Sequence, residues 1–549
     1  MRTIVTALLF EIVIKKRYSQ LLVMKYIWLV FFIIPIVSLH SESHSDSAIH
    51  TLYHSISEND ISKLLAFYQL YPDTIYGNRA LHSAWENLQK HRTEKIPITS
   101  RIDLPSIDID TMIQFLSQTS TVTQNLLDSN QIELLERISN HLINRKLKGH
   151  EVWDKEELIR LDPEEIDLSR AILLHEFDNT QTIRQYEVFL DCMALQILST
   201  LPLSATPIDK IHALNNWIFY ERQFRFPPHS LWPKDIDSYT LLAQVIDNRQ
   251  GVCLGVSILY ICLAQRLGVS LQIFTPPGHI YLSYTDNNQT INIETTARGR
   301  NVPTRDYVSS NIRVLQKRSL MEVVGMVFIN QGSKFLRLQD YRKAIKFYDK
   351  AIMYLPNDPI VKELLGFTLL FTKTREKEAI ELLSSVSNNF NPALIYQSSL
   401  AKDYLENRIN LEGVKTLWLP VREARESILE KNLQLKKLIE EFPITREGLF
   451  QLAISYLQLS NTIEAEKILL KYITIAPEHP TVHYYLSILA KKHMNLPTAW
   501  KHYRIAASII ESSNGNLYFL QNLYKQLQSL LPEAAIVSIK STEYKGKKI

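Results

Sequence analysis

Apolar residues recur at helical spacing through most of the chain. In residues 61–67 and 132–138, leucine and isoleucine stand three or four positions apart, which is the pattern of one face of an amphipathic helix. A polar, proline-containing stretch at 91–105 separates these segments. The pattern predicts a helical N-terminal region over residues 47–150, in which we identify no catalytic or binding motif.

Residues 155–310 show a different pattern of apolar and polar positions, in which helical segments are followed by strand-like ones. Helical segments at 166–175, 186–199 and 207–221 lead into a proline-rich loop and then into a nearly all-apolar helix. This helix opens at Gly251-Val252-Cys253 and ends near Gly268, which suits a left-handed helix cap. Three strand-like segments follow at 270–274, 279–284 and 290–295, with turn residues between them. We therefore expect an α+β domain in which helices pack on a small antiparallel sheet.

Beyond residue 320 the pattern repeats with a period of 34, which indicates stacked pairs of helices. Small residues allow antiparallel helices to approach closely, and aromatic residues fill the groove between repeats. Residues 393–445 look helical but break the period, and 515–531 suit a capping helix. The small, aromatic and proline positions of the four windows are Gly332, Phe335, Ala344, Tyr348, Ala351 and Pro356; Gly366 and Ala379; Ala453, Tyr456, Ala465 and Pro477; and Ala490, Ala499, Tyr503 and Ala506.

These positions resemble tetratricopeptide repeats. Phe328, Leu449 and His483 stand where the repeat consensus has tryptophan. The resemblance implies an all-α solenoid over 320–535 that binds a protein or peptide, followed by a basic tail at 536–549.

The N-terminus has the layout of an export signal. An apolar run at 27–39, interrupted only by Pro35, follows Met24-Lys25 and precedes a short stretch of serines. We expect the range 1–45 to contain a signal peptide or membrane anchor, with translation beginning at Met24 and residues 1–23 not belonging to the translated protein. If 21–39 is one segment, an uncleaved membrane anchor is the alternative, and a buried helix is a third. The expected location is periplasmic or anchored in an inner membrane.

Composition excludes some function classes. With 549 residues the chain is too long for one hydrophobic core, so several domains are expected. Its 46% hydrophobic and 21% charged residues are ordinary for a globular protein. A net charge of +4 without a basic stripe argues against nucleic acid as a partner.

The three cysteines do not form a disulfide framework. Cys192 and Cys262 lie in apolar helical stretches, where cysteine is usually a small core residue. A disulfide bond between Cys192 and Cys262 remains an alternative if the chain is exported. Cys253 differs because it stands at the start of its helix, where the positive end of the helix dipole favours the thiolate.

Cys253, His279 and Glu294 carry the candidate chemistry. They supply, in chain order, a nucleophile, a base that activates it, and a carboxylate that orients the base. If His279 and Glu294 lie on neighbouring antiparallel strands, their side chains face each other. Gln250 is placed to donate a hydrogen bond to a developing oxyanion. The set needs no metal and no cofactor. Taken singly, each residue is more often structural.

The motif around these residues resembles the transglutaminase-like superfamily, in a bacterial branch with trailing tetratricopeptide repeats. The resemblance is carried by Gly251-Val252-Cys253, Leu263-Ala264-Gln265-Arg266-Leu267-Gly268-Val269, Gly278-His279 and Ile293-Glu294-Thr295-Thr296. It implies a papain-like core over 155–310, with Cys253 as nucleophile, His279 as base and Glu294 where the family usually has aspartate. Some relatives carry proline in place of the nucleophile, so the retained cysteine permits catalysis without proving it.

Two functions remain open from the sequence. The first is an exported thiol hydrolase or acyl-transferase acting on an amide or isopeptide bond of a protein or peptide held by the repeats. The second is a non-catalytic scaffold in which the same core is inactive and the repeats do the binding.

Overall fold

The computed structural model describes residues 46–93, 113, 127–227, 237–276, 278–307, 316–388, 398–419, 421, 424–512 and 517–533. The chain divides into two compact units, residues 1–84 and residues 85–549. The export segment and the basic tail lie outside the described residues, so both remain predictions. No described helix is long and apolar enough to cross a membrane.

The first unit is built from short helices: α2 (Asp46–His54), α3 (Ile61–Leu70) and most of α4 (Ile75–Leu88). Helix α3 begins after Asp60, whose carboxylate accepts a hydrogen bond from the backbone N–H of Lys63 at 3.1 Å. The buried face of α3 has the helical spacing predicted from the sequence and consists of Ile61, Leu64, Leu65 and Phe67.

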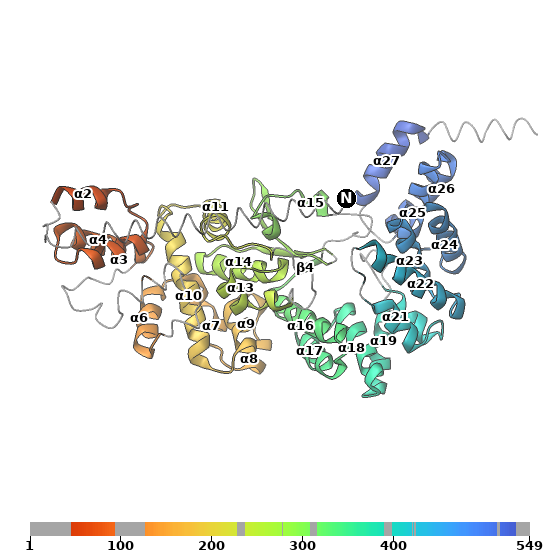
Figure 1. The fold of residues 1–549 in the computed structure, drawn as a ribbon, viewed down its shortest axis with the longest axis horizontal. Helices are drawn as coiled ribbons and strands as arrows, with labels where there is room; N and C mark the ends of the chain where they lie inside the picture. The colour runs from red at the N-terminus through yellow and green to blue at the C-terminus, as the bar shows by residue number, and fades with distance from the viewer. Residues whose placement is uncertain are drawn as a thin grey trace, which may run out of the picture. The chain divides into compact units, whose positions relative to one another are not determined.

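In the second unit, helices lead into and surround the buried helix α14 (Cys253–Leu267) (Figure 1). Almost every residue of α14 is buried, which explains why its sequence is apolar on nearly all faces. Gly268 ends it in the left-handed conformation, with φ of 71°, as predicted. The other elements before the sheet are α6 (Ser129–Ser139), η2 (Ile143–Lys146), α7 (Lys148–Glu151), α8 (Lys155–Ile159), η3 (Pro163–Glu165), α9 (Leu168–Glu176), α10 (Thr180–Ser199), α11 (Pro207–Asn215), η4 (Asn216–Glu221), η5 (Asp237–Thr240) and α13 (Leu242–Asn248).

The sheet is antiparallel and has the order β3-β2-β1-β4. Its strands are β1 (Gln272–Thr275), β2 (Tyr281–Thr285), β3 (Thr290–Ile293) and β4 (Gln316–Arg318). The three strands expected from the sequence are present, although His279 precedes β2 by two residues and is not its first residue. Strand β4 was not predicted. It is three residues long and pairs Arg318 with Ile273 on β1.

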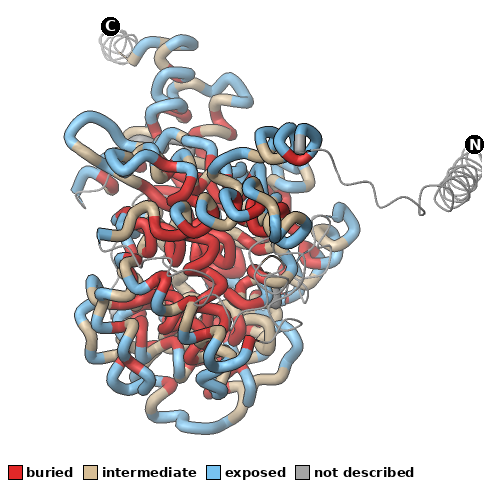
Figure 2. Tube along the Cα trace, turned by 90° about the vertical axis from the view of Figure 1, so that its left-hand side faces the viewer, coloured by how far each residue is buried: buried red, intermediate tan, exposed pale blue. Residues whose placement is uncertain are grey.

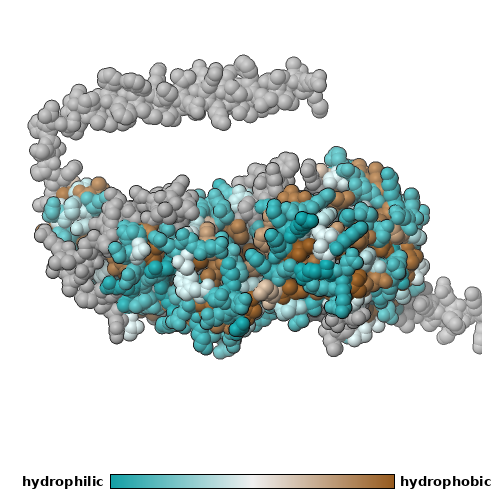
Figure 3. Space-filling model, turned by 90° about the horizontal axis from the view of Figure 1, so that it is seen from below, coloured by the Kyte–Doolittle hydropathy of each residue, from teal (hydrophilic) through white to brown (hydrophobic). Residues whose placement is uncertain are grey.

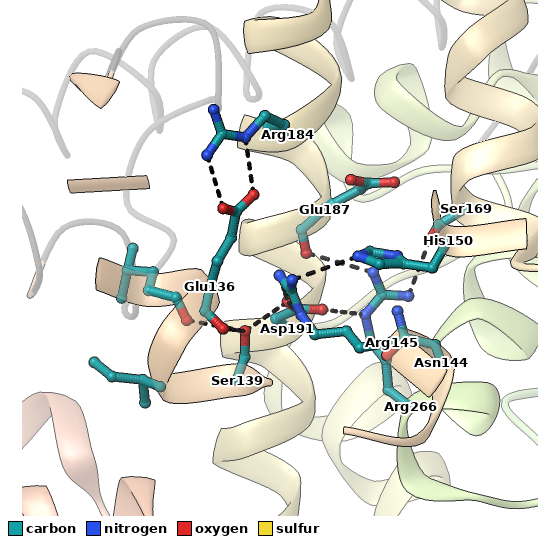
Figure 4. A network of polar contacts seen from close by, with 12 residues as sticks. Glu136, Ser139, Asn144, Arg145, His150, Ser169, Arg184, Glu187, Asp191 and Arg266 are labelled. Carbon is teal, nitrogen blue, oxygen red and sulfur yellow. Dashed lines mark hydrogen bonds and ion pairs between the residues drawn. The ribbon is translucent and has the colours of Figure 1, made fainter. Parts of the chain in front are cut away.

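A network of buried charges ties the lead-in helices to α14 (Figure 4). Arg266 of α14 bonds Asp191 of α10 at 2.8 Å, and Arg145 bonds the other oxygen of that carboxylate. Arg170 forms a bidentate ion pair with Glu187, with N···O distances of 2.6 and 2.7 Å. Burial acts to raise the pKa of Asp191, but Arg145 and Arg266 overcome it and hold this pKa below its usual value.

After the short elements η6 (Thr295–Ala297) and α15 (Thr304–Tyr307), the chain continues as an array of helices in which sequence neighbours pack on one another. Gly332 shows why small residues recur there, because a Cβ on it would lie 2.5 Å from the ring of Tyr348. Figure 2 shows buried residues, in red, gathered in the interior of the second unit, with exposed residues, in pale blue, around them. The array consists of α16 (Leu320–Arg337), α17 (Tyr341–Tyr354), α18 (Pro359–Thr372), α19 (Glu376–Asn388), α20 (Leu400–Leu405), α21 (Leu411–Trp418), α22 (Arg425–Glu441), α23 (Arg446–Gln458), α24 (Thr462–Ile475), α25 (Pro480–Lys492), α26 (Leu496–Ser512) and α27 (Tyr518–Leu530).

Candidate active site

Cys253 is the first residue of α14, and the loop before it is held by backbone hydrogen bonds. The N–H of Val252 donates to the carbonyl of Tyr239, and the N–H of Gly251 donates to that of Arg225, both at 3.1 Å. A Cβ on Gly255 would lie 2.3 Å from the Tyr239 oxygen, so only glycine lets this backbone pack so closely on the helix. No side chain caps the helix at Val252. The first-turn N–H groups beside Cys253 are therefore not occupied by a cap.

Cys253 is also the most accessible of the three thiols. All three cysteines are free, but Cys192 and Cys262 are buried, and burial raises the pKa of both. Cys253 is half-buried. A reagent in solution can therefore reach Cys253 more easily than the other two.

His279 connects the thiol to the acid. Its Nε2 lies 2.7 Å from Oε2 of Glu294, and its side chain also makes a hydrogen bond with Cys253. Because Nε2 is used by Glu294, Nδ1 is the ring nitrogen left for the thiol. Burial acts to lower the pKa of His279, but the hydrogen bonds and negative charges of Cys253 and Glu294 outweigh it and raise this pKa to about 9. This raised pKa favours the protonated ring, an imidazolium.

The backbone before His279 forms a turn that sets the ring in place. The N–H of His279 donates to the carbonyl of Pro276 at 3.0 Å, and Gly278 has φ of 71°. A side chain at residue 278 would be strained in that conformation.

Glu294 is held by donors on both carboxylate oxygens. Oε1 accepts from the hydroxyl and the backbone N–H of Thr296, and Oε2 accepts from His279 and from the Tyr307 hydroxyl at 2.9 Å. Burial acts to raise the pKa of Glu294, but the bonds to His279, Thr296 and Tyr307 hold it below its usual value. Glu294 therefore stays ionised and fixes the orientation of the imidazole.

Tyr307 is a member of the site that the sequence did not reveal. Its ring lies 6.1 Å from the His279 ring at 19° and 3.8 Å from the Tyr281 ring at 6°. Tyrosine is most often a packing residue, so nothing in the local pattern marked Tyr307. Thr296 was not assigned a role from the sequence either, although it stands two residues after Glu294.

A second contact missed from the sequence joins α14 to the segment after β3 that carries Glu294. The hydroxyls of Ser257 on α14 and Thr295 are 3.1 Å apart. Ser257 lies one helical turn after Cys253, and Thr295 follows Glu294 directly. This buried bond therefore fixes the thiol relative to the carboxylate.

Gln250 sits in the loop before Cys253, where its backbone bridges to Arg225. The residue is half-buried. The structure thus places Gln250 next to the first turn of α14, while its role as an oxyanion donor remains a prediction. The catalytic roles of Cys253, His279 and Glu294 likewise remain predictions, although the structure brings these side chains together.

His150, Asp167 and Glu187 are a group in the described part of the chain whose ligand atoms lie within 4.8 Å of one another. The group is poorly suited to a cation, because Arg170 already bonds both oxygens of Glu187. Asp167 is likewise bonded by His150 and Ser169. We interpret the cluster as part of the charge network of Figure 4.

A transglutaminase-like domain occupies residues 184–319, which match the model of the Transglutaminase-like superfamily. This segment contains α14, all four strands of the described sheet, and Cys253, His279 and Glu294. The match covers a minor part of the chain, and the domain boundaries expected from the sequence remain a prediction.

No curated protein matches the sequence. Among solved structures, a crystal structure of MamA is 17% identical, with a TM-score of 0.19, over 33% of this chain and 96% of that one. A MamA structure from Desulfovibrio magneticus RS-1 is 14% identical, with a TM-score of 0.18, over 34% of this chain and 96% of that one. At these scores the likeness carries no argument about function.

Proposed function

We propose that this protein is an exported cysteine-dependent enzyme that hydrolyses or transfers the acyl group of an amide or isopeptide bond. The observation that carries the proposal is the position of His279, whose ring bonds both the Cys253 thiol and the Glu294 carboxylate. This is the arrangement in which a thiolate is paired with an imidazolium and is ready to attack a carbonyl.

The reaction proceeds in two balanced steps. The Cys253 sulfur attacks the carbonyl carbon, the C–N bond breaks, and the His279 imidazolium gives its proton to the leaving amine. Water, or an amine in a transfer reaction, then attacks the thioester while His279 takes up its proton. The C–S bond breaks, and the thiolate–imidazolium pair is restored. Glu294 keeps the same ring tautomer throughout.

The oxyanion of each tetrahedral intermediate is held at the first turn of α14. The backbone N–H of Cys253 and the side chain of Gln250 are the donors we assign to it. The uncapped start of the helix supports this assignment, because its N–H groups and the helix dipole both favour negative charge.

The helices after residue 319 form tetratricopeptide repeats that hold the protein or peptide substrate. Their close helix pairs, such as the contact of Gly332 with Tyr348, support this assignment. Exposed apolar side chains on the array include Ile444, Ile463 and Met494. The face drawn in Figure 3 shows apolar residues, in brown, between polar ones, in teal.

Export is the location we propose, on the strength of the N-terminal apolar run. Fractionation of cells that produce the full chain, followed by N-terminal sequencing, tests it. The expected product is found outside the cytoplasm and begins after residue 39, or is retained in the membrane with the run intact.

Alkylation by iodoacetamide tests the enzyme proposal, with each cysteine followed by peptide mass spectrometry. At pH 7, Cys253 should react while Cys192 and Cys262 are protected by burial. His279→Ala should slow the reaction of Cys253 by about 10- to 100-fold, because the thiolate loses its counter-ion. His212→Ala, which changes an exposed histidine on α11, is the matched control and should have no effect.

The opposite result favours the scaffold. If Cys253 is inert in the folded protein, or if His279→Ala leaves its rate unchanged, the three residues do not work together. The transglutaminase-like domain is then a packed module, and binding by the helices is the remaining function.

A further inference from the structure

The loop that follows Glu294 holds the backbone of this acid at both of its polar groups. The N–H of Glu294 donates to the carbonyl of Arg300 at 3.1 Å. Its own carbonyl accepts from the N–H groups of Ala297 and Gly299, at 3.1 and 2.9 Å. The position of the Glu294 backbone, and with it the direction of the carboxylate, therefore depends on where this loop lies.

Asn215, the last residue of α11, fixes this loop from outside. Its Nδ2 donates to the carbonyl of Gly299 at 3.2 Å. Gly299 has φ of 73°, and a Cβ on it would lie 2.2 Å from Oδ1 of Asn215. Glycine is therefore required at residue 299 for two reasons: its backbone conformation, and the close packing of the Asn215 amide on it.

The same amide is bonded to α14, the helix that carries the candidate nucleophile. Helix α11 packs on α14 (Figure 1), and the Tyr260 hydroxyl of α14 donates to Oδ1 of Asn215 at 3.0 Å. Tyr260 is fully buried, so its hydroxyl needs an acceptor inside the protein. Because the carbonyl of Gly299 can only accept, it takes the amide nitrogen of Asn215 and leaves Oδ1 for Tyr260.

One face of α14 thus makes two links to the segment after β3. Cys253, Ser257 and Tyr260 stand four and then three positions apart, which places them on the same face of the helix. Ser257 bonds Thr295 directly, whereas Tyr260 reaches the loop through Asn215. The second link lies further from the thiol and holds the far end of the loop.

We propose that Asn215 is a positioning residue of the site: by joining α14 to the loop after Glu294, its amide keeps the carboxylate where it bonds His279. The inference rests on the proposed function, since the position of Glu294 affects a reaction only if Cys253 reacts. Asparagine suits this role because one short side chain offers both a donor and an acceptor. Asn215 acts through the backbone of Gly299 and is not itself a catalytic residue.

Asn215→Ala in the full chain tests the inference, and Asn216→Ala is the matched control. Asn216 is exposed, and its amide donates to Glu221. We expect the NMR titration of the His279 ring in Asn215→Ala to move down by about half a pH unit or more from about 9, because a displaced carboxylate stabilises the imidazolium less. Alkylation of Cys253 at pH 7 should slow by about threefold or more, since less of the thiol is held as thiolate. The control should leave both quantities unchanged.

Tyr260→Phe is a second variant, which removes the hydroxyl at the other end of the link and keeps the bond from Asn215 to Gly299. It should move the titration of His279 in the same direction by a smaller amount. If Asn215→Ala does not fold, this variant decides, and an unchanged titration would contradict the inference. The carbonyl of Ile211, 3.4 Å from the Tyr260 hydroxyl, remains as an acceptor in Asn215→Ala and favours folding.

A purely structural role gives a different result. Asn215→Ala would then have a lower melting temperature, but the titration of His279 and the alkylation rate of Cys253 would match those of Asn216→Ala. That result would overturn the inference and leave the proposed function unaffected. If instead the His279 ring of the unaltered protein titrates near its ordinary value of about 6.5 and Cys253 is inert, the proposed function fails and the inference fails with it.

Discussion

At the scale of single residues, the site depends on how Glu294 is satisfied. Its carboxylate accepts hydrogen bonds from His279, Thr296 and Tyr307, so it remains charged although it is buried. Oε2 of the glutamate side chain lies 2.7 Å from the imidazole Nε2 of His279. A buried carboxylate with fewer donors would be protonated more easily.

Replacing the Glu294 carboxylate should make the Cys253 thiol less reactive. In Glu294→Gln the negative charge that helps to raise the pKa of His279 is lost, so this pKa falls and less imidazolium is present at pH 7. We expect alkylation of Cys253 at pH 7 to slow by about tenfold or more. Glu294→Asp keeps the charge and should retain more reactivity than Glu294→Gln. Equal rates in all three proteins would show that Glu294 does not support the thiol.

Removing the hydroxyl of Tyr307 should raise the pH at which Cys253 loses its reactivity on acidification. Tyr307→Phe keeps the stacked ring but takes one donor from Glu294, so the pKa of Glu294 rises. As pH falls, the carboxylate is then protonated sooner, and the reactivity of Cys253 should be lost at a higher pH than in the unaltered protein. The rate at pH 7 should change by less than about threefold. Tyr284→Phe on β2 is the control, and an identical shift in both variants would exclude a specific role for Tyr307.

At the scale of elements, helices and strands with a strong local pattern were predictable. Helix α14, its glycine cap and the three strands β1 to β3 follow from apolar runs and turn residues. Strand β4 does not, because a three-residue strand is defined by its partner, and β1 lies some forty residues earlier in the chain. The contact of Ser257 with Thr295 was missed for the same reason. It depends on which helix packs on which strand, and neither residue signals this alone.

In the candidate site, only residues whose type itself indicates a catalytic role could be predicted from the sequence. Cysteine at a helix start, histidine after a glycine and a glutamate at a strand end are informative because few other roles explain them together. Tyr307 was not predictable, since an isolated tyrosine after a proline-containing loop is usually part of a core.

The charge network that joins α14 to α10 gives a stability prediction. Arg266→Met leaves Asp191 buried with one guanidinium fewer, and we expect the free energy of unfolding in urea to fall by about 3–5 kcal/mol. Arg160→Met removes a surface pair with Glu156 and should change this free energy by less than about 1 kcal/mol. Similar losses in both variants would mean that the buried network contributes no more than a surface pair.

The same network predicts the direction of acid sensitivity. The pKa of Asp191 is lowered in the folded protein, so its contribution to stability is present above the usual pKa and is lost as pH falls through the folded value. The difference in stability between the unaltered protein and Arg266→Met should therefore shrink below about pH 4. Urea unfolding at pH 3 and pH 7 measures it, and a difference that is constant with pH would contradict the assignment.

In the molecule as a whole, a helical array follows the transglutaminase-like domain, and we assign the proposed chemistry to the domain and the proposed substrate binding to the array. Cys253 lies on α14 and is not part of the helical array. The variant Cys253→Ala should therefore still bind a protein substrate through the array but should not convert it. Chemical cross-linking of this full-length variant, followed by mass spectrometry, should place a bound substrate on residues 320–530. Cross-links confined to the neighbourhood of residue 253 would argue that the array does not hold the substrate.

An NMR titration of the His279 ring nitrogens is the sharpest check on the proposed pairing of Cys253 with His279. The ring should stay protonated at pH 7 and titrate near pH 9, and it should titrate at a lower pH in Cys253→Ala. A ring that titrates near its ordinary value of about 6.5, equally in the unaltered protein and in Cys253→Ala, would show that the two side chains do not act as a pair.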